Sequence, residues 1–600
     1  MSRRTRRLSA VASLCIVGLA VSACSGTVKT TSGGAKSEGP AVSGGTLNML
    51  GTGDIDYMDP NIAYYSGTYL NLRMWSRQLF SNPAIVGKET TAAPDLATEL
   101  PTVANGGISA DGLTYNFKIR SGAKWNTTPA RQVTAADTVR GVKRTCNPVQ
   151  PFGGTPDFQD LIVGYAKFCE SFAASGKSAK AMGDFMEKTD LPGVVAKDET
   201  TVTFKLTHPA AYFVAMLTLP AFSPAPVEFN KYVPAGPELA ANTISDGPYK
   251  IDSYVATKSI NLSRNPAWVA STDPIRKAYV DKIVVNETLT QDSVQQQLQT
   301  GSPSADMGWD TFPPANQLPP LIAKKDPLLT LGDSISSNPF VLFNTVSPNN
   351  KKALGNVKVR QALSYALNRN NIIQVLGGPK VAVPLTHILP SEIVGGENSF
   401  DLYPYDVAKA KQMLSDAGFP NGLTLKLLYR NKSAGNTKAF QTIQQDLSKA
   451  GIKVTGLPSA NADFYTKYLS KADVAPRGVY DLAVEGWGPD WYGNAALSFF
   501  KPLFSGKPSF PPTGSNYGFF DSPAANKAIA AAEKAGTEAE AKTLWAAADR
   551  AVMEDAAIFP ITNPRTANYH AAQVHNAVHM PAFQQFDATN VWIDKAKQGG

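Results

Sequence analysis

The chain is poor in the residues that build metal sites and catalytic nucleophiles. It has four cysteines and five histidines in 600 residues, and no group of them has the spacing of a metal-ligand set. The Gly-x-Ser-x-Gly and His-Glu-x-x-His motifs are both missing. Ser171 stands where a phosphate-binding loop ending in "GKS" at 176–178 needs a glycine. We therefore expect no enzymatic activity, no metal and no cofactor.

A membrane-spanning run is also missing. The apolar stretch at 8–20 is too short to cross a bilayer comfortably and follows four arginines, which is typical of a secretory signal. It ends in "VSAC", which resembles a bacterial lipobox, so we expect residues 1–23 to be removed and Cys24 to be lipidated. An ordinary signal cut after Ala23, with Cys24 incidental, is the alternative. Residues 24–44 contain almost nothing large and apolar, which predicts a flexible tether. The mature protein is expected outside the cytoplasm, held to the outer face of the membrane by its lipid.

Charge and cysteine usage fit that location. Loss of the four signal arginines lowers the formal net charge from +8 to +4, and no long Lys/Arg run remains, so we expect no nucleic-acid partner. Cys15 leaves with the signal, and Cys146 and Cys169 remain as a pair. In an oxidising compartment we predict that they form a disulfide, worth roughly 3 kcal/mol by loop closure; two buried free thiols are the alternative.

Apolar periodicity divides the chain into a strand-rich first part and an alternating second part. Period-two patterns predict strands at 113–119 and 201–206, with a helix between them that opens on a Thr134–Asp137 capping box. A helix at 406–418 is predicted to begin at the N-cap Asp406 and to stop at Gly418. The other predicted elements are helices within 358–376 and 439–451 and strands at 423–429 and 452–454. This alternation indicates an α/β lobe, and about 555 residues after the tether indicate more than one domain.

A series of short motifs resembles the extracellular solute-binding proteins, family 5, of peptide and nickel ABC importers. They lie in order between Gly44 and about Pro560 and include "GGTLNML", "DGLTYNFKIRSGAKW", "VRQALSYALNR" and "YDLAVEGWGPDW". The resemblance implies an α/β fold with two lobes, a periplasmic-binding-protein-like clamshell (type II, cluster C). Lobe 1 would comprise 45–285 plus 561–600, with an inserted subdomain at about 67–190, and lobe 2 would comprise 286–560. The implied partners are an ABC permease and its ATPase, and the protein is expected to be a monomer.

The stretch "GWGPDWYGN" at 486–494 places Asp490 between Trp487 and Trp491. A carboxylate walled by indoles pairs strongly with an ammonium group, because the local dielectric is low and the rings add cation–π attraction. In family members that take peptides, the aspartate of Gly-Trp-x-x-Asp pairs with the peptide α-ammonium, and Gly486, Trp487 and Asp490 match those places. A basic residue that some oligopeptide binders have six places earlier is Val484 here. A ligand without a free amino terminus is therefore an alternative, as is a turn that Asp490 merely caps.

The remaining candidate contacts come from the same resemblance. They are Thr52, Tyr57, Tyr64, Asn344, Trp491, Tyr492 and Asn516. Asn344 is equally consistent with a buried structural amide, and the loop residues Tyr492 and Asn516 with ordinary packing.

We predict a substrate-binding lipoprotein that captures di- or oligopeptides between two lobes and delivers them to a permease. An oligosaccharide receptor of the same fold, a secreted lipoprotein hydrolase and a surface adhesion or signalling module are the alternatives.

Overall fold

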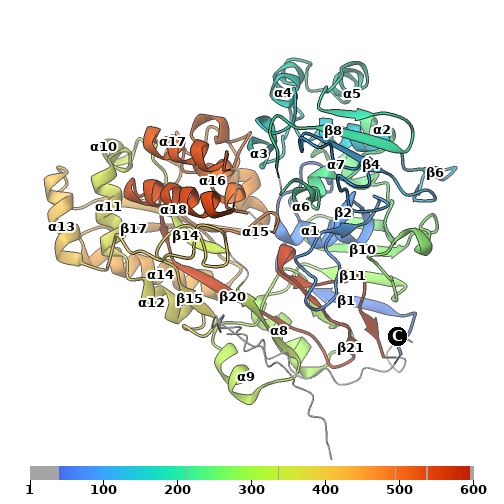
Figure 1. The fold of residues 1–600 in the computed structure, drawn as a ribbon. Helices are drawn as coiled ribbons and strands as arrows, with labels where there is room; N and C mark the ends of the chain where they lie inside the picture. Colours follow the sequence, from blue (N-terminus) through green and yellow to red (C-terminus); the bar gives the residue numbers. More distant parts are fainter. Residues whose placement is uncertain (1–39, 211, 335–336, 493–494, 536–537, 595–600) are drawn as a thin grey trace, which may run out of the picture. The chain divides into compact units, whose positions relative to one another are not determined.

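The computed structural model describes residues 40–210, 212–334, 337–492, 495–535 and 538–594, and Figure 1 shows their fold. The predicted signal, Cys24 and the tether before residue 40 lie outside the described residues. Within the described ranges, no helix is both long enough and apolar enough to cross a bilayer.

The first large sheet has five strands in the order β12-β1-β11-β10-β9. Their bounds are Met307–Gly308, Thr46–Leu50, Lys282–Asn286, Ser259–Arg264 and Tyr249–Val255. β1 runs parallel to β11 and β12, whereas β10 is antiparallel to both of its neighbours. β1 has a neighbouring strand on each side, so the loop that follows it begins at the end of an inner strand. Helix α1 (Ser66–Trp75) comes after this loop.

The second large sheet also has five strands, in the order β17-β16-β18-β14-β19. Their bounds are Lys453–Ser459, Thr424–Arg430, Leu482–Trp487, Asn338–Phe343 and Ile558–Pro560. β16 is parallel to β17 and β18, and β14 is antiparallel to β18 and β19. The surrounding helices are α11 (Val357–Ala366), α12 (Arg369–Val375), α13 (Val407–Asp416), α14 (Ala434–Lys449), α16 (Ala496–Phe504), α17 (Pro523–Ala532) and α18 (Glu538–Glu554). In Figure 1, α12 and α14 lie on one side of this sheet and α16 to α18 on the other.

A three-stranded sheet, β13-β20-β15, connects the two. β20 (Thr562–Tyr569) follows β19 almost directly and pairs antiparallel with β13 (Leu329–Ser334) and β15 (Ala382–Pro384). The next residue, His570, forms a bridge to Met307 of the first sheet. One continuous segment therefore runs from the second sheet to the first.

A smaller sheet, β4-β8-β7, lies in the first part of the chain. Its strands are Thr114–Lys118, Thr201–Lys205 and Val194–Ala196, and helices α2 (Ala135–Arg144), α3 (Pro156–Gln159), α4 (Tyr165–Ala173) and α5 (Ala179–Lys188) belong to the same region. A disulfide joins Cys146, just after α2, to Cys169 in α4, with their Cα atoms 5.5 Å apart. The loop that it closes contains α3.

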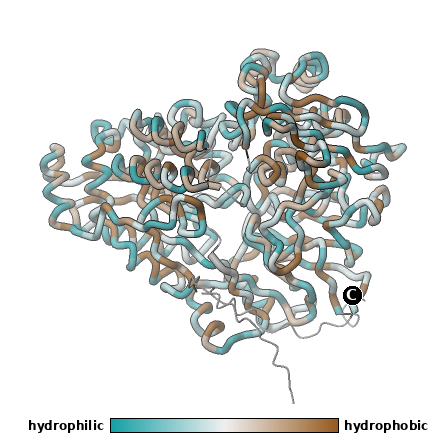
Figure 2. The backbone as a smooth tube through the Cα atoms, viewed as in Figure 1, coloured by the Kyte–Doolittle hydropathy of each residue, from teal (hydrophilic) through white to brown (hydrophobic). Residues whose placement is uncertain are grey.

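Hydrophobic side chains form two large cores. One lies on the first sheet and includes Met49, Trp75 and Phe586. The other, which includes Phe158 and Phe499, is shared by the region of the β4-β8-β7 sheet and the second large sheet. Figure 2 shows hydrophobic stretches along the strands and hydrophilic residues along most outer turns. Burial of these faces is the main favourable contribution to folding.

Several predicted elements are confirmed with their local chemistry. The capping box is present at the start of α2, where Thr134 accepts from the Asp137 amide and Asp137 accepts from the Thr134 amide. Asp406 caps α13 by accepting from the Lys409 amide at 2.9 Å. The helical pattern at 358–376 is divided in two, because Asn368 leaves the helix and caps α12 with its own side chain.

The division into lobes stays a prediction. β12 at Met307–Gly308 pairs with β1, so the first sheet includes residues beyond position 286. The returning residues 571–593 contribute to the core on that same sheet.

Candidate ligand-binding site

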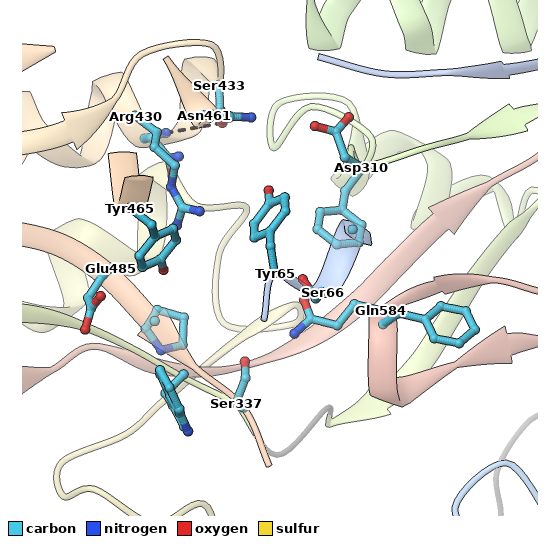
Figure 3. A pocket seen from close by; sticks show the side chains of 18 of the residues that line it. Tyr65, Ser66, Asp310, Ser337, Arg430, Ser433, Asn461, Tyr465, Glu485 and Gln584 are labelled. Atoms are coloured by element: carbon cyan, nitrogen blue, oxygen red, sulfur yellow. Dashed lines mark hydrogen bonds between the residues drawn. The ribbon is translucent and has the colours of Figure 1, made fainter. Parts of the chain in front are cut away.

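A cavity of about 510 Å³ is lined by segments from both large sheets. The first sheet contributes the loop after β1, from Thr52 to Tyr65, and Asp310, which follows β12. The second contributes Arg430 at the end of β16 and the segment from Val484 to Asp490 at the end of β18. Figure 3 shows Arg430 and Tyr465 on one wall, Asp310 across from them and Tyr65 between. This volume is typical of a pocket for a small ligand.

Asp490 lies in the loop after β18, beyond Pro489. The Tyr64 hydroxyl donates to its Oδ2 at 2.6 Å, and its own amide donates to the Ser498 hydroxyl at 3.3 Å. The side chain is half-buried on the cavity wall, and no cation among the described residues pairs with it. Burial raises the pKa of Asp490 to about 7, although the hydrogen bond from Tyr64 acts in the opposite direction. Asp490 is therefore a carboxylate without a counter-ion in the part of the chain that the structure describes.

Aromatic rings hold this part of the wall in place. The Trp487 indole donates to the Ser498 carbonyl at 2.8 Å, and its ring meets that of Tyr64 edge-on at 5.3 Å between centroids. Tyr64 also packs on Phe152 at 4.6 Å. A Cβ on Gly153 would lie 2.6 Å from the Tyr64 ring, so glycine at this position leaves room for the tyrosine.

The loop after β1 is organised by one carboxylate. Oδ1 of Asp56 accepts from the Tyr57 amide at 2.8 Å and the Thr68 hydroxyl at 2.6 Å. Its Oδ2 accepts from the amides of Tyr64 and Tyr65 at 2.7 and 3.1 Å. These four bonds use the carboxylate fully, so we assign Asp56 to positioning the tyrosines.

Arg430 contributes a guanidinium to the opposite wall. Its Cζ lies 4.9 Å from the ring centroid of Phe464 and 5.8 Å from that of Tyr465. Among the described residues, Arg430 has no ion-pair partner and its Nε has no hydrogen-bond partner. Glu485 is the nearest candidate counter-ion, but it is 2 % exposed and both of its carboxyl oxygens lack partners in the described part of the chain.

The charge of Arg430 therefore remains available. Burial raises the pKa of Glu485 to about 8, despite the opposing effect of Arg430, so this carboxyl group is mostly protonated at neutral pH. A half-buried guanidinium whose acidic neighbour is uncharged is a suitable site for a carboxylate, since charge-assisted hydrogen bonds gain strength away from water.

Asp310 lies on the wall formed by the first sheet. Its Oδ1 accepts from the Thr52 amide at 2.7 Å and its Oδ2 from the Thr52 hydroxyl at 3.0 Å. Asn461, just before the helical segment that carries Tyr465, donates to the same hydroxyl at 3.3 Å. Burial raises the pKa of Asp310 to about 6, although the Thr52 bonds lower it. Thr52 thus joins the two walls through hydrogen bonds.

The structure brings five of the expected contact residues to this cavity: Thr52, Tyr57, Tyr64, Trp487 and Asp490. The other four do not line it. The Asn344 amide is fully buried and donates to the carbonyls of Ala475 and Tyr480 at 2.9 and 2.8 Å. Asn516 bonds both ends of its amide to the backbone of Phe520. The geometry therefore gives these two amides structural roles.

The two aromatic residues after Asp490 also lie behind the wall. Trp491 is 1 % exposed and stacks on Tyr212 with 5.9 Å between ring centroids. Tyr492 is half-buried and its hydroxyl has no partner among the described residues.

Sequence reasoning missed Arg430, Glu485 and Asp310. Each is a single charged residue at a strand end or in a loop, with no motif around it. Only the alternation of "LTLKLLYR", which places Arg430 at the end of a strand in an α/β lobe, was available as a signal.

Among the described residues, no group of three His, Cys, Asp or Glu side chains is arranged to hold a metal ion. Two five-stranded sheets are joined by the strand β20, and residues near their strand ends line a ligand-sized cavity, an arrangement typical of two-lobed solute-binding proteins. The chain belongs to the bacterial extracellular solute-binding proteins, family 5, whose model matches residues 91–511.

Known proteins agree with this class and with the predicted two-lobed α/β fold. The glutathione-binding protein GsiB of Pectobacterium atrosepticum is 26% identical over 493 residues, 80% of this chain and 84% of that protein. OppA of Haemophilus influenzae, in complex with the peptide RPPGFSPFR, has a TM-score of 0.75 at 20% identity, over 92% of this chain and 99% of that chain. The murein tripeptide binding protein MppA of Escherichia coli has the same TM-score, identity and coverage.

Proposed function

We propose that this protein binds short peptides with free amino and carboxyl termini and delivers them to an ABC permease. The observation that carries the proposal is that Asp490 and Arg430, neither of which has an ion-pair partner among the described residues, lie on the walls of one cavity. A zwitterionic peptide supplies an ammonium for the first and a carboxylate for the second. The walls between them are rich in tyrosine and include Trp487, and such aromatic surfaces tolerate varied side chains.

Similar proteins support the peptide assignment. One relative is named for glutathione, and the structural neighbours for an oligopeptide complex and a murein tripeptide. The cavity volume favours the short end of that range, because a pocket of a few hundred cubic ångströms encloses a ligand of drug size.

Isothermal titration calorimetry with Ala-Ala-Ala and two blocked analogues tests the proposal. We expect N-acetylation and C-terminal amidation each to weaken binding at least about tenfold, since each leaves one buried charge unpaired. Arg430→Gln should remove the penalty for the amide but not for the acetyl group, and Asp490→Asn the reverse. Tight binding of a neutral trisaccharide with no binding of any peptide would instead establish a sugar receptor.

We propose further that ligand stabilises a closed arrangement of the two sheets. The hydrogen bonds Tyr64–Asp490 and Asn461–Thr52 join their cavity walls. In addition, Lys501 pairs with Asp160 at 2.6 Å and Thr155 donates to the Thr513 carbonyl at 2.8 Å. A ligand that bridges Asp490 and Arg430 with residues of the first sheet adds contacts available only in this arrangement, so it shifts the equilibrium toward it.

We also propose that Cys24 carries the lipid that anchors the protein beside its permease. Metabolic labelling with a fatty-acid analogue should mark the full-length chain and not the Cys24→Ser variant. Equal labelling of both would exclude this anchor.

A further inference from the structure

Besides Arg430, the described residues that line the ligand cavity include two more cations. Lys432 follows β16, two residues after Arg430, and Arg565 lies in β20. Both residues are exposed, whereas Arg430 is half-buried. Neither Lys432 nor Arg565 has an ion-pair or side-chain hydrogen-bond partner in the described part of the chain. A ligand that pairs with Asp490 and Arg430 therefore leaves two solvent-accessible positive charges unpaired.

Lys432 lies on the same side of the chain as Arg430. The Asn431 amide donates to the Ser459 carbonyl at 3.1 Å, so the chain stays paired and extended beyond the end of β16. Residues two apart in an extended chain share a face. This register places Lys432 on the cavity side together with Arg430, and both residues line the cavity.

Arg565 reaches the cavity from the connecting strand. It shares a face of β20 with Ala567, because the two residues are two apart in a strand. Ala567 packs on Leu318 and Val381, and all four residues line the cavity. The face of β20 that carries Arg565 is therefore the face that borders the cavity.

The segment that follows α12 lies between the two cations. Its Val381 carbonyl accepts from the Arg565 amide at 2.8 Å. At its other end, the Leu376 side chain would lie 3.8 Å from a Cβ on Gly435, three residues after Lys432. Lys432 and Arg565 therefore border one end of the cavity from two sides.

The acids of the cavity leave this end positively charged. Five of them line it in the described part of the chain: Asp54, Asp56, Asp310, Glu485 and Asp490. Three hydrogen bonds use the carboxylate of Asp54, and four use that of Asp56. Thr52 occupies both oxygens of Asp310, Glu485 is buried, and we assign Asp490 to the ligand ammonium. Among the described residues that line the cavity, no acid is exposed, and the two exposed charged residues are both cations.

We propose that the end of the cavity between Lys432 and Arg565 binds a side-chain carboxylate of the ligand, so the preferred peptides carry an acidic residue at the last or next-to-last position. This rests on the proposed function, because Arg430, two residues from Lys432, must hold the terminal carboxylate of the same peptide. Two neighbouring cations attract an anion through their summed field, and exposed charges are screened by salt. The preference should therefore be strongest at low ionic strength.

Calorimetry at pH 7.5 and about 20 mM ionic strength tests the proposal with Ala-Ala-Glu, Ala-Glu-Ala, their glutamine counterparts Ala-Ala-Gln and Ala-Gln-Ala, and Ala-Ala-Lys. We expect at least one glutamate peptide to bind about fivefold more tightly than its glutamine counterpart, the effect of partly exposed charge pairs. Ala-Ala-Lys should bind more weakly than Ala-Ala-Gln. Raising the ionic strength to about 0.5 M should reduce both differences.

Two variants locate the effect. Lys432→Gln and Arg565→Gln each remove an exposed charge without a partner among the described residues, so both are expected to fold. Each should reduce the preference for the glutamate peptide, and the double variant should abolish it. Lys438→Gln is the matched control, because Lys438 is an exposed lysine of α14 that does not line the cavity, and it should leave the preference unchanged.

Four results would overturn the proposal. Equal affinity for the glutamate and glutamine peptides refutes the assignment of this end of the cavity and leaves the proposed function intact. A preference that survives the double variant places the carboxylate elsewhere. A preference that Lys438→Gln reduces as much as Lys432→Gln does reflects the general surface potential and no site. Failure of all five peptides to bind refutes the proposed function and this inference together.

Discussion

At the scale of single residues, we propose that Asp490 destabilises the ligand-free protein and stabilises the ligand-bound one. Its half-buried carboxylate receives one hydrogen bond from Tyr64 and no cation among the described residues. Burial raises its pKa, so ionisation is less favourable in the folded chain than in the unfolded chain. In the proposed complex, a ligand ammonium would make ionisation of Asp490 favourable again.

Replacement of Asp490 by Asn should therefore weaken the binding of Ala-Ala-Ala by about 2–4 kcal/mol, the range for loss of one partner of a buried charge pair. Calorimetry at pH 8 measures this loss. Asp416→Asn is the matched control, because it removes the same formal charge from the exposed surface of α13. Unchanged affinity of Asp490→Asn, with folding intact, would refute the ammonium assignment.

The pKa of about 7 at Asp490 predicts how affinity depends on pH. Only the ionised carboxylate pairs with an ammonium, so affinity should be constant above that pKa and fall by about tenfold per pH unit below it. Above about pH 8 the ligand loses its own ammonium proton, which gives a second decline. Titrations from pH 5 to pH 9 should show this bell-shaped profile.

The Asp490→Asn variant is the control for the acid limb, which it should lack. A wild-type affinity that stays flat between pH 5 and pH 7 would contradict the pairing.

Stability of the empty protein should change in the opposite direction. The folded-state pKa of Asp490 is raised, so its cost is absent below the unfolded pKa near 4 and grows as pH rises toward 7. Asp490→Asn should therefore resist urea better than wild type at pH 8 and equally well at pH 4.

At the scale of elements, local chemistry made some features predictable. Thr134 and Asp406 cap their helices through side chains only three residues away from the amides they bind. The glycines and Pro489 in 486–494 indicate the loop that holds Asp490, although Gly486 and Trp487 still belong to β18. Such short-range interactions depend on a few consecutive residues, so the sequence alone can predict them.

Other features depend on partners far along the chain and could not be predicted. The helix break at Asn368 is supported by Asp446, which accepts the Asn368 amide at 3.1 Å from 78 residues away. Arg430 becomes a site residue only because β16 and β18 lie next to each other and bring it to the cavity that Asp490 lines. No spacing along the sequence encodes that proximity.

The disulfide between Cys146 and Cys169 should stabilise the region of the β4-β8-β7 sheet. The two residues are 23 apart, and closing a loop of this length corresponds to roughly 3 kcal/mol by the chain-entropy estimate. Urea denaturation of Cys146→Ser/Cys169→Ser should show a loss of that order. Dithiothreitol should lower the free energy of unfolding of the wild type to that of the variant and leave the variant unchanged. Equal stability of the oxidised wild type and the variant would contradict the estimate.

At the scale of the whole molecule, the alternation of strands and helices after residue 350 correctly predicted an α/β arrangement. The path of β20 could not be predicted from the sequence. Its residues pair with β13 and β15, and each of these strands is more than 170 residues away in the sequence. The polar sequence "TNPRTANY" of β20 is itself typical of a loop. Long-range pairing, not local preference, makes it a strand.

Ligand binding should raise the stability of the whole molecule. At a free peptide concentration one hundred times the Kd, binding to the folded state adds about 2.7 kcal/mol. A thermal-shift titration with Ala-Ala-Ala should show a Tm that rises with concentration, and N-acetyl-Ala-Ala-Ala at equal concentration should give a smaller rise. Identical shifts for the two peptides would show that the amino terminus is not recognised.

The loop closed by Cys146 and Cys169 includes Gln150, Pro151 and Gly153, which form part of the cavity wall. The wall against which Tyr64 packs is thus tethered by a bond that forms only under oxidising conditions. Protein purified from a reducing cytosol would lack the disulfide and should bind ligand more weakly. Secreted protein would keep the disulfide and the position of this wall. The oxidation state of Cys146 and Cys169 should therefore be reported with every dissociation constant measured for this solute-binding protein.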